Sequence, residues 1–189
     1  LIHYFTQGGT LMRMLFSIDK HDYDPDAPRF VRPSARGIIC KEGRLAMIHS
    51  LSYDYYKFPG GGIEAGEDRT AALCREVAEE AGLSVIPASI RPYGQVHRIQ
   101  RGQHGDTFVQ DNYYYLCDTE DTPLPQHLDD YEAEERFTLE WVTPAEAIAV
   151  NRRDRTGDPR FDPVYRVMLE REAQVLEMLV AEGLLPAGG

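Results

Sequence analysis

Three glutamates lie close together in the sequence, and their spacing suits metal chemistry. Glu76, Glu79 and Glu80 stand at positions i, i+3 and i+4, so on a helix their carboxylates share one face within about one turn. Three unpaired carboxylates at such short range would repel one another and raise one another's pKa values. A divalent cation removes this repulsion, and clustered hard oxygen ligands suit Mg²⁺ or Mn²⁺ better than Zn²⁺.

The segment that carries these glutamates has the signals of a helix of about four turns. Asp68 stands where an N-cap carboxylate belongs, and Gly82 stands where a left-handed C-cap belongs. Small or apolar residues recur at helical spacing and predict the face that packs on the core: Ala71, Cys74, Val77, Ala78 and Ala81. A merely solvated acidic face is the alternative interpretation of the three glutamates.

The wider pattern resembles the Nudix box. That motif consists of Gly, five residues, Glu, seven residues, Arg-Glu, an aliphatic residue, any residue, Glu-Glu, any residue, Gly and an aliphatic residue. Every fixed position is matched here: Gly61, Glu67, Arg75, Glu76, Val77, Glu79, Glu80, Gly82 and Leu83. The motif covers 23 of the 189 residues. Weaker similarity extends to Phe58-Pro59-Gly60-Gly61 and to a Trp141-Val142 strand followed by a helix. The complete match makes the solvated-face interpretation the weaker of the two.

The order of the expected elements predicts the fold class. We expect strands or extended segments over 12–18, 36–40, 45–49, 53–58, 83–90, 94–99, 108–117 and 137–142. Strands precede the box helix, further strands follow it, and helices come last, without the regular alternation of a doubly wound parallel sheet. This order indicates an α+β protein. The resemblance agrees, because it implies the Nudix fold, an α/β/α sandwich with a mixed β-sheet.

The ends of the chain suggest its domain organisation. Pro144 is suited to the first turn of a short helix, and residues 163–185 have the pattern of a long amphipathic helix. We therefore expect a single Nudix hydrolase domain over 12–189 with a C-terminal helix. Residues 1–11 lack the features of a signal peptide and precede two methionines, Met12 and Met14. We interpret them as a leader or an added segment that catalysis does not need.

Composition limits the classes of partner and compartment. The formal net charge of −11 argues against non-specific binding to nucleic acid or to an acidic membrane. No apolar run is long enough to span a bilayer. The three cysteines have no zinc-ligand spacing, so we expect three reduced, buried thiols and a cytoplasmic protein.

The resemblance implies a Nudix pyrophosphohydrolase, an enzyme that hydrolyses a nucleoside diphosphate linked to another moiety with the help of Mg²⁺ or Mn²⁺. By resemblance, Glu79 and Glu80 bind the metal, and Glu76 is a further ligand or deprotonates the attacking water. The backbone carbonyl of Gly61 completes the metal site. Arg75 and Glu67 form a supporting ion pair.

Many Nudix enzymes use one more glutamate, in a loop shortly before the Trp-containing strand, as a general base or an extra ligand. Glu134 lies seven residues before Trp141 and is our first candidate, with Glu132 and Glu135 next. The alternative is a solvated charge run, in which case Glu76 is the base.

The substrate is the least determined part of the prediction. Gln100 stands where enzymes for dinucleoside polyphosphates have tyrosine, and Pro92 comes too early for the proline of ADP-ribose enzymes. The expected substrate is a nucleotide or a nucleotide-sugar, and the sequence does not choose among nucleoside triphosphates, oxidised nucleotides, nucleotide-sugars and dinucleoside polyphosphates. We expect Arg98 to contact phosphate and Tyr56 to stack on the base, although a solvated loop and a packed strand are the respective alternatives. Other aromatic residues could also stack on a base: Tyr53, Tyr55, Phe58, Tyr113, Tyr114 and Tyr115.

Two non-enzymatic functions are alternatives, and the protein is expected to be a monomer or a homodimer. A nucleotide-sugar-sensing regulator needs a DNA-binding domain, and the region after Asn151 offers one long helix and no evident basic patch. A non-catalytic Nudix binding module usually lacks a box glutamate, and none is missing here.

Overall fold

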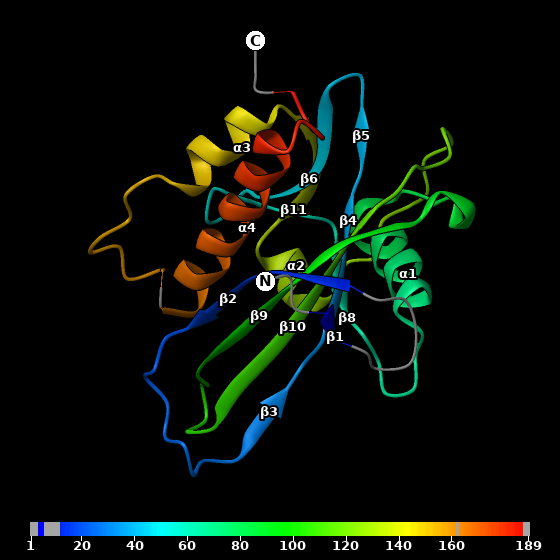
Figure 1. The fold of residues 1–189 in the computed structure, drawn as a ribbon. Coiled ribbons are helices and arrows are strands. Elements are labelled where there is room, and N and C mark those ends of the chain that lie inside the picture. Colours follow the sequence, from blue (N-terminus) through cyan, green and yellow to red (C-terminus); the bar gives the residue numbers. More distant parts are fainter. Residues whose placement is uncertain (1–3, 6–11, 162, 187–189) are drawn as a thin grey trace.

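Residues 4–5, 12–161 and 163–186 are described by the computed structural model of the chain, in which two β-sheets lie between helices (Figure 1). The larger sheet has the order β1-β2-β9-β10-β4-β8, and β3 also pairs with β10. β9 and β10 are antiparallel, whereas β2 and β4 run parallel to their neighbours β9 and β10. The sheet is therefore mixed, as expected. Its strands are β1 (Tyr4–Phe5), β2 (Met12–Asp19), β3 (Arg29–Val31), β4 (Ser34–Ile38), β8 (Gly60–Gly62), β9 (Arg91–Arg101) and β10 (Thr107–Leu116).

The smaller sheet is antiparallel and has the order β11-β6-β5, with β7 also paired to β6. The turn between β5 and β6 is formed by Glu42 and Gly43, whose φ angles of 51° and 77° suit a tight two-residue hairpin. The strands are β5 (Cys40–Lys41), β6 (Arg44–Ser50), β7 (Tyr55–Lys57) and β11 (Phe137–Val142).

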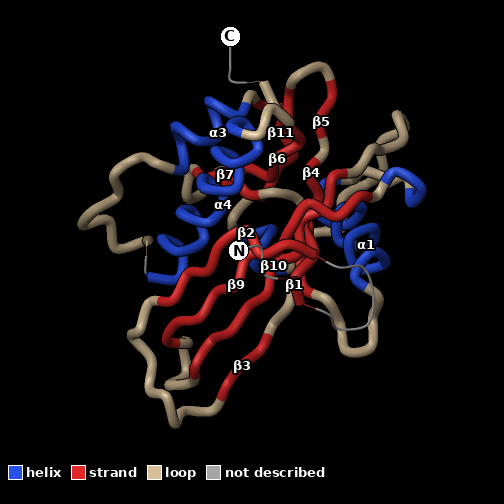
Figure 2. The backbone as a smooth tube through the Cα atoms, in the orientation of Figure 1, coloured by secondary structure: helices blue, strands red, loops and turns tan. Residues whose placement is uncertain are grey.

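Helices cover the sheets from two sides (Figures 1 and 2). One side is covered by α1 (Arg69–Ala81), which packs on β4 and β8. The other side is covered by α3 (Pro144–Asn151) and α4 (Pro163–Ala181), which pack on each other and on β7. A short helix, α2 (Asp130–Glu134), precedes β11. The predicted α/β/α sandwich is thereby confirmed.

The tyrosines of β10 show how alternation places residues on the two faces. Tyr113 faces α1, where the guanidinium of Arg69 lies 3.8 Å from its ring centroid. Tyr114 faces α4, where its hydroxyl donates to Oε1 of Glu172 at 3.1 Å. All of Tyr113–Tyr115 is buried, so this run is core rather than a base-stacking surface.

Several local predictions were wrong. Residues 83–90 form no strand but a 3₁₀ turn at Pro87–Ser89, because proline cannot donate to a sheet. Two segments for which the sequence predicted no strand or helix contain β3 and α2. α4 ends at Ala181 rather than at residue 185, and Gly183 follows with a φ of 70°.

Burial also differs from the prediction at two places. Ala71 is exposed, whereas Ala72, Leu73 and Glu80 join Val77 and Ala81 on the buried face of α1. Cys40 is exposed, Cys74 is partly buried and Cys117 is buried, and all three thiols are free.

The amino-terminal prediction is only partly covered by the structure. Residues 1–3 and 6–11 lie outside the described residues, while Tyr4 and Phe5 pair with Arg13 and Met12 in the larger sheet. Among the residues that the structure describes, no helix combines the length and the hydrophobicity needed to cross a membrane.

A fully buried ion pair connects α4 to the larger sheet. Arg171 donates to Oε1 of Glu172 through Nε at 2.9 Å and Nη2 at 2.6 Å, and through Nη1 to Oδ1 of Asn112 at 2.8 Å. Both charged side chains are at most 1% exposed. Glu172 also accepts from the backbone N of Phe58 at 2.7 Å. The pair therefore positions the segment that leads into the Nudix box.

We expect Arg171→Met to lower the free energy of unfolding by about 3 kcal/mol, because it leaves the buried Glu172 carboxylate without its partner. Urea denaturation at neutral pH measures this change. The matched control is Arg152→Met, which removes an exposed pair with Glu177 and should cost at most about 1 kcal/mol. Equal losses in the two variants would show that burial of the Arg171–Glu172 pair is not what matters.

Candidate active site

The helix that carries the box glutamates begins and ends as the sequence indicated. Asp68 caps α1, since its Oδ2 accepts from the backbone N of Thr70 at 2.9 Å and of Ala71 at 3.2 Å. Gly82 ends the helix in the left-handed region, with a φ of 64°, which favours glycine. These caps fix the register of α1 and hence the directions in which its glutamates point.

Glu80 is the buried member of the three glutamates, with 1% of its surface exposed. Its Oε1 pairs with Nζ of the buried Lys57, and its Oε2 accepts from the backbone N of Gly60 at 2.9 Å. Burial raises the pKa of the Glu80 carboxyl, and the positive charges of Lys57 and Arg36 oppose that shift. Glu80 thus joins α1 to β7 and to the start of β8.

Arg36 holds the same glycine segment from β4. Its Nη1 donates to the carbonyl oxygens of Phe58 at 3.2 Å and Gly60 at 2.8 Å. The buried cations Arg36 and Lys57 were not among the predicted site residues. The available signal was weak: each is a charged residue at a position of a strand that is otherwise apolar.

Glu76 lies directly against the backbone of Gly61. A Cβ atom at Gly61 would stand 2.1 Å from Oε2 of Glu76, so no residue larger than glycine fits without displacing the carboxylate. Burial raises the pKa of the Glu76 carboxyl, and Arg75 opposes that shift. The glycine of the box therefore makes room for a carboxylate beside the main chain.

Arg75 connects the exposed side of the box. Its Nε and Nη2 donate to the two carboxylate oxygens of Glu67, both at 2.8 Å, and Nη2 also donates to the carbonyl oxygen of Gly62 at 3.0 Å. Its Nη1 reaches Glu76 at 2.7 Å and Glu79 at 3.2 Å. The guanidinium lowers the pKa of Glu67 to about 2. The geometry is that of the supporting ion pair expected from the sequence.

The donor atoms fit a hard divalent cation in type, but they are not gathered around one point. Within the described ranges, no three carboxylate, imidazole or thiol groups converge on a common centre. Arg75 neutralises Glu76 and Glu79, and Lys57 neutralises Glu80. The all-oxygen donor set, with the Glu76 carboxylate held against the main chain at Gly61, suits Mg²⁺ or Mn²⁺, provided that the carboxylates exchange these cations for the metal.

The three loop glutamates occupy different environments around α2. Glu134 is exposed. Glu132 is buried and accepts from the backbone N of Asp129 at 3.0 Å and from the hydroxyl of Tyr131 at 2.9 Å. Its negative charge contributes to raising the pKa of Glu80, so its carboxylate lies near the box.

Glu135 is bound on both carboxylate oxygens by hydroxyl groups. Oε2 accepts from Ser50 at 3.1 Å and from Tyr55 at 2.6 Å, and Oε1 accepts from Tyr165 at 2.6 Å. These bonds hold Glu135 as a structural acceptor between β6, β7 and α4.

The two residues expected to bind substrate lie in the interior. Arg98 is 3% exposed, donates from Nε to Oε1 of Gln100 at 2.9 Å and lies over the ring of Phe108. Tyr56 is 7% exposed, donates to Oε2 of Glu140 at 2.7 Å and stacks on His49. Neither side chain is open to a ligand in this structure.

An aromatic cavity of about 490 Å³ lies beside α2. The rings of Tyr53 and Tyr165 are stacked there, with centroids 5.2 Å apart and planes at 21°. Tyr131 also lines the cavity, and its hydroxyl bonds to Glu132. Its residues are Ser52, Tyr53, Tyr131, Glu134, Glu135, Arg160 and Tyr165. Of these, Tyr53, Glu134 and Glu135 were named from sequence, whereas Arg160 and Tyr165 come from a segment distant in the sequence from the other lining residues.

Comparison with known proteins identifies the family. The model of the NUDIX domain matches residues 31–165. The chain belongs to the NUDIX family. It is also similar to a NUDIX hydrolase from Nitrosomonas europaea, with a TM-score of 0.52, 18% identity and coverage of 75% of this chain and 87% of that one. This likeness bears on the fold, and it confirms the Nudix fold expected from sequence.

Two further similarities are more limited. An RNA pyrophosphohydrolase from Halorhodospira halophila is 37% identical over 68 residues, which is 35% of this chain and 36% of that protein. A MutT NUDIX hydrolase from Burkholderia pseudomallei has a TM-score of 0.48 and 20% identity, covering 75% of this chain and 97% of that one. The assignment of the chain to the NUDIX family rests on the family model over residues 31–165.

The Glu67–Arg75 pair makes a prediction about pH. Because the folded-state pKa of Glu67 is about 2 and the unfolded value is about 4.3, the pair stabilises the fold fully above the unfolded pKa. That stabilisation is lost as the pH falls toward the folded pKa. The free energy of unfolding of the wild type should therefore exceed that of Glu67→Gln near pH 6, and the difference should shrink toward pH 3.

Urea titrations across this pH range measure the difference. Glu120→Gln, which changes an exposed carboxylate outside the box, serves as the control and should show no such trend. If the difference in the free energy of unfolding between the wild type and Glu67→Gln did not depend on pH, the assigned ion pair would be contradicted.

Proposed function

We propose that the protein is a Nudix pyrophosphohydrolase that uses Mg²⁺ or Mn²⁺ to hydrolyse a nucleoside diphosphate linked to another moiety. The observation that carries the proposal is the complete box, in which Glu76 lies against Gly61 and Glu80 is anchored on Gly60. Free thiols suit a reducing cytoplasm, where we expect the protein to act as a monomer or a homodimer.

The box residues have distinct roles in this proposal. Glu76, Glu79, Glu80 and the carbonyl of Gly61 would hold the cation. When bound, the cation neutralises phosphate oxygens and makes water a better nucleophile. Arg75 and Glu67 keep the helix and the preceding loop in register, a role that supports the ligands rather than the reaction itself.

Hydrolysis then requires a carboxylate that accepts a proton. As the water oxygen attacks phosphorus, its proton passes to the base, a new P–O bond forms and the bridging P–O bond breaks. The leaving phosphate takes the electron pair of the broken bond. We assign the base to Glu134, because its carboxylate is exposed and borders the aromatic cavity, whereas Glu132 and Glu135 are buried in hydrogen bonds.

The aromatic cavity is the proposed nucleotide-binding region. Its volume of about 490 Å³ lies in the range of small-molecule sites, and the rings of Tyr53 and Tyr165 offer faces on which a base can stack. Tyr131 connects this cavity to Glu132 and hence to the surroundings of Glu80. We therefore assign base stacking to the rings of this cavity, in place of Tyr56, which we expected from the sequence to stack on the base.

We expect Glu79→Gln to lower kcat by about 10²-fold, on the scale of losing a main electrostatic stabiliser, and excess chelator to abolish turnover. Glu79 is the most suitable position because its side chain is 44% exposed, so the fold tolerates the change. The Glu80→Gln variant should also lose activity. This change leaves Lys57 buried without a partner, however, so the variant should also be less stable. Turnover with Mg²⁺, measured from the hydrolysis products, reports the loss of activity in both variants.

Glu120→Gln is the control for these variants and should keep wild-type turnover. Full turnover in excess chelator would remove the metal from the proposal. A Glu79→Gln variant with normal kcat would remove this residue from the metal site.

The base assignment is tested by Glu132→Gln, Glu134→Gln and Glu135→Gln under saturating Mg²⁺. We expect Glu134→Gln to lower kcat by about 10²-fold with little change in the melting temperature. Glu135→Gln should instead lower the melting temperature, since Glu135 accepts three hydroxyl groups. If all three variants stay within a few-fold of wild-type kcat, the base lies in the box and Glu76 takes that role.

A substrate panel separates the proposed enzyme from the non-catalytic alternatives. Nucleoside triphosphates, nucleotide-sugars, dinucleoside polyphosphates and RNA with a 5′-triphosphate should be assayed with product identification. The last substrate is included because of the RNA pyrophosphohydrolase relative. Binding of a nucleotide-sugar without any hydrolysis product across the panel would favour a sensing or binding module.

A further inference from the structure

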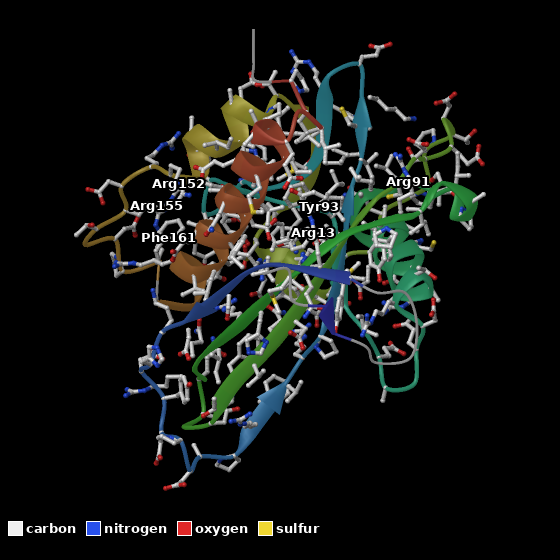
Figure 3. All side chains as sticks on the ribbon, in the orientation of Figure 1. Arg13, Arg91, Tyr93, Arg152, Arg155 and Phe161 are labelled. Atoms are coloured by element: carbon white, nitrogen blue, oxygen red, sulfur yellow. The ribbon has the colours of Figure 1, made fainter. Side chains whose placement is uncertain are left out.

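A small cleft lined by arginines lies at the connection between α3 and α4. It encloses about 300 Å³ and is lined by four arginines, Arg152, Arg153, Arg155 and Arg166, together with the carboxylates of Asp154 and Glu170. The sequence indicated no basic patch here, because aspartates are interspersed with the arginines between residues 152 and 162. Folding gathers the guanidinium groups on the outer side of α3 and α4, where Figure 3 labels Arg152 and Arg155. We name this feature the arginine cleft.

Two of its arginines lack an acidic partner. In the part of the chain that the structure describes, no carboxylate lies within ion-pair distance of Arg155 or Arg166. Arg155 donates from Nη2 to the carbonyl of Val150 at 3.0 Å and to that of Asp54, and its buried Nε has no hydrogen-bond partner. Arg166 donates from Nε to the carbonyl of Phe161 at 3.1 Å. Both guanidinium groups thus retain charge and donors for an anion.

The cations of the cleft are crowded. Burial lowers the pKa of Arg155, the carboxylate of Asp54 opposes that shift, and the nearby charges of Arg153 and Arg160 add to it. The other two lining arginines are engaged at the surface, Arg152 with Glu177 and Arg153 with Asp54. Exposed pairs of this kind contribute little and exchange readily for a stronger acceptor. A doubly charged phosphate with several oxygens is such an acceptor.

The arginine cleft adjoins the aromatic cavity through Phe161. Arg155 lies 4.5 Å and Arg160 lies 5.9 Å from the centroid of this ring. Arg160 lines the aromatic cavity, whereas Arg155 lines the cleft. A chain of nucleotides that leaves the cavity past Arg160 would therefore reach the cleft next.

We propose that the arginine cleft binds a phosphate group, and that in the substrate this is the phosphodiester that follows the 5′ nucleotide held in the aromatic cavity. The second part rests on the proposed function. The net charge of −11 repels nucleic acid elsewhere on the surface, so recognition is confined to the end of the chain. A free inorganic phosphate also presents anionic phosphate oxygens, with a higher charge than a phosphodiester, and is the other source of ligand.

The first test measures binding of inorganic phosphate to the full chain by ³¹P NMR. Chelator is present so that no metal in the box contributes to phosphate binding. Arg166→Gln and Arg155→Gln should weaken binding by about tenfold, the scale of one charge-assisted hydrogen bond. The matched control is Arg91→Gln, at an exposed arginine on the other side of the molecule (Figure 3). Arg166 is exposed, so its variant remains informative if Arg155→Gln lowers the melting temperature.

The second test compares KM for a nucleoside 5′-triphosphate with KM for a dinucleotide carrying a 5′-triphosphate. Arg166→Gln should raise KM about tenfold for the dinucleotide alone and leave kcat unchanged. If phosphate binding weakens while both KM values stay equal to wild type, the cleft binds free phosphate and the assignment to the substrate chain is wrong. If phosphate binding by both variants equals that of Arg91→Gln, the site itself is wrong. A wild type that hydrolyses neither compound contradicts the assignment to the substrate chain but not the proposed function, which also covers nucleotide-sugars and dinucleoside polyphosphates. The phosphate titration still decides the cleft.

Discussion

The buried ion pair between Lys57 and Glu80 is the constraint on which the candidate active site depends. An ionised carboxylate at 1% exposure is stable only if a cation and hydrogen-bond donors accompany it. Lys57 supplies the cation from β7, and the backbone N of Gly60 supplies a donor. These two contacts require β7, the glycine segment and α1 to meet at one place. The positions of the remaining box residues follow from these contacts, because Glu76 is close to Glu80 in sequence and Gly61 directly follows Gly60.

The same glycine segment is held from the opposite layer of the sandwich. Glu172 of α4 accepts from the backbone N of Phe58, and its charge is balanced by Arg171. Arg36 donates to the carbonyls of Phe58 and Gly60 between the two layers. The approach to the box is therefore fixed by buried charges on both sides rather than by apolar packing alone. Networks of this kind are rigid when fully paired and costly when one member is lost.

The sequence predicted local features well, because their causes are local. The caps at Asp68 and Gly82 and most strands follow from neighbouring residue types, whereas the Glu67–Arg75 pair was implied by the resemblance to the Nudix box. The sequence failed where tertiary pairing decides. Helical periodicity placed Ala71 on the core side of α1 and Glu80 on the acidic face. In the structure, Glu80 is buried in an ion pair with Lys57, and Ala71 is exposed. The cavity beside α2 joins three distant segments, so no sequence window could reveal it.

The central claim is that the box carboxylates exchange their protein cations for a divalent metal. Titration of Mn²⁺ with detection of the free ion by electron paramagnetic resonance tests this claim without any assumption about substrate. We expect the wild type to bind Mn²⁺, and the double variant Glu76→Gln/Glu79→Gln to bind it at least about tenfold more weakly, since two charged oxygen ligands are lost. Equal Mn²⁺ affinity in the two proteins would contradict the account.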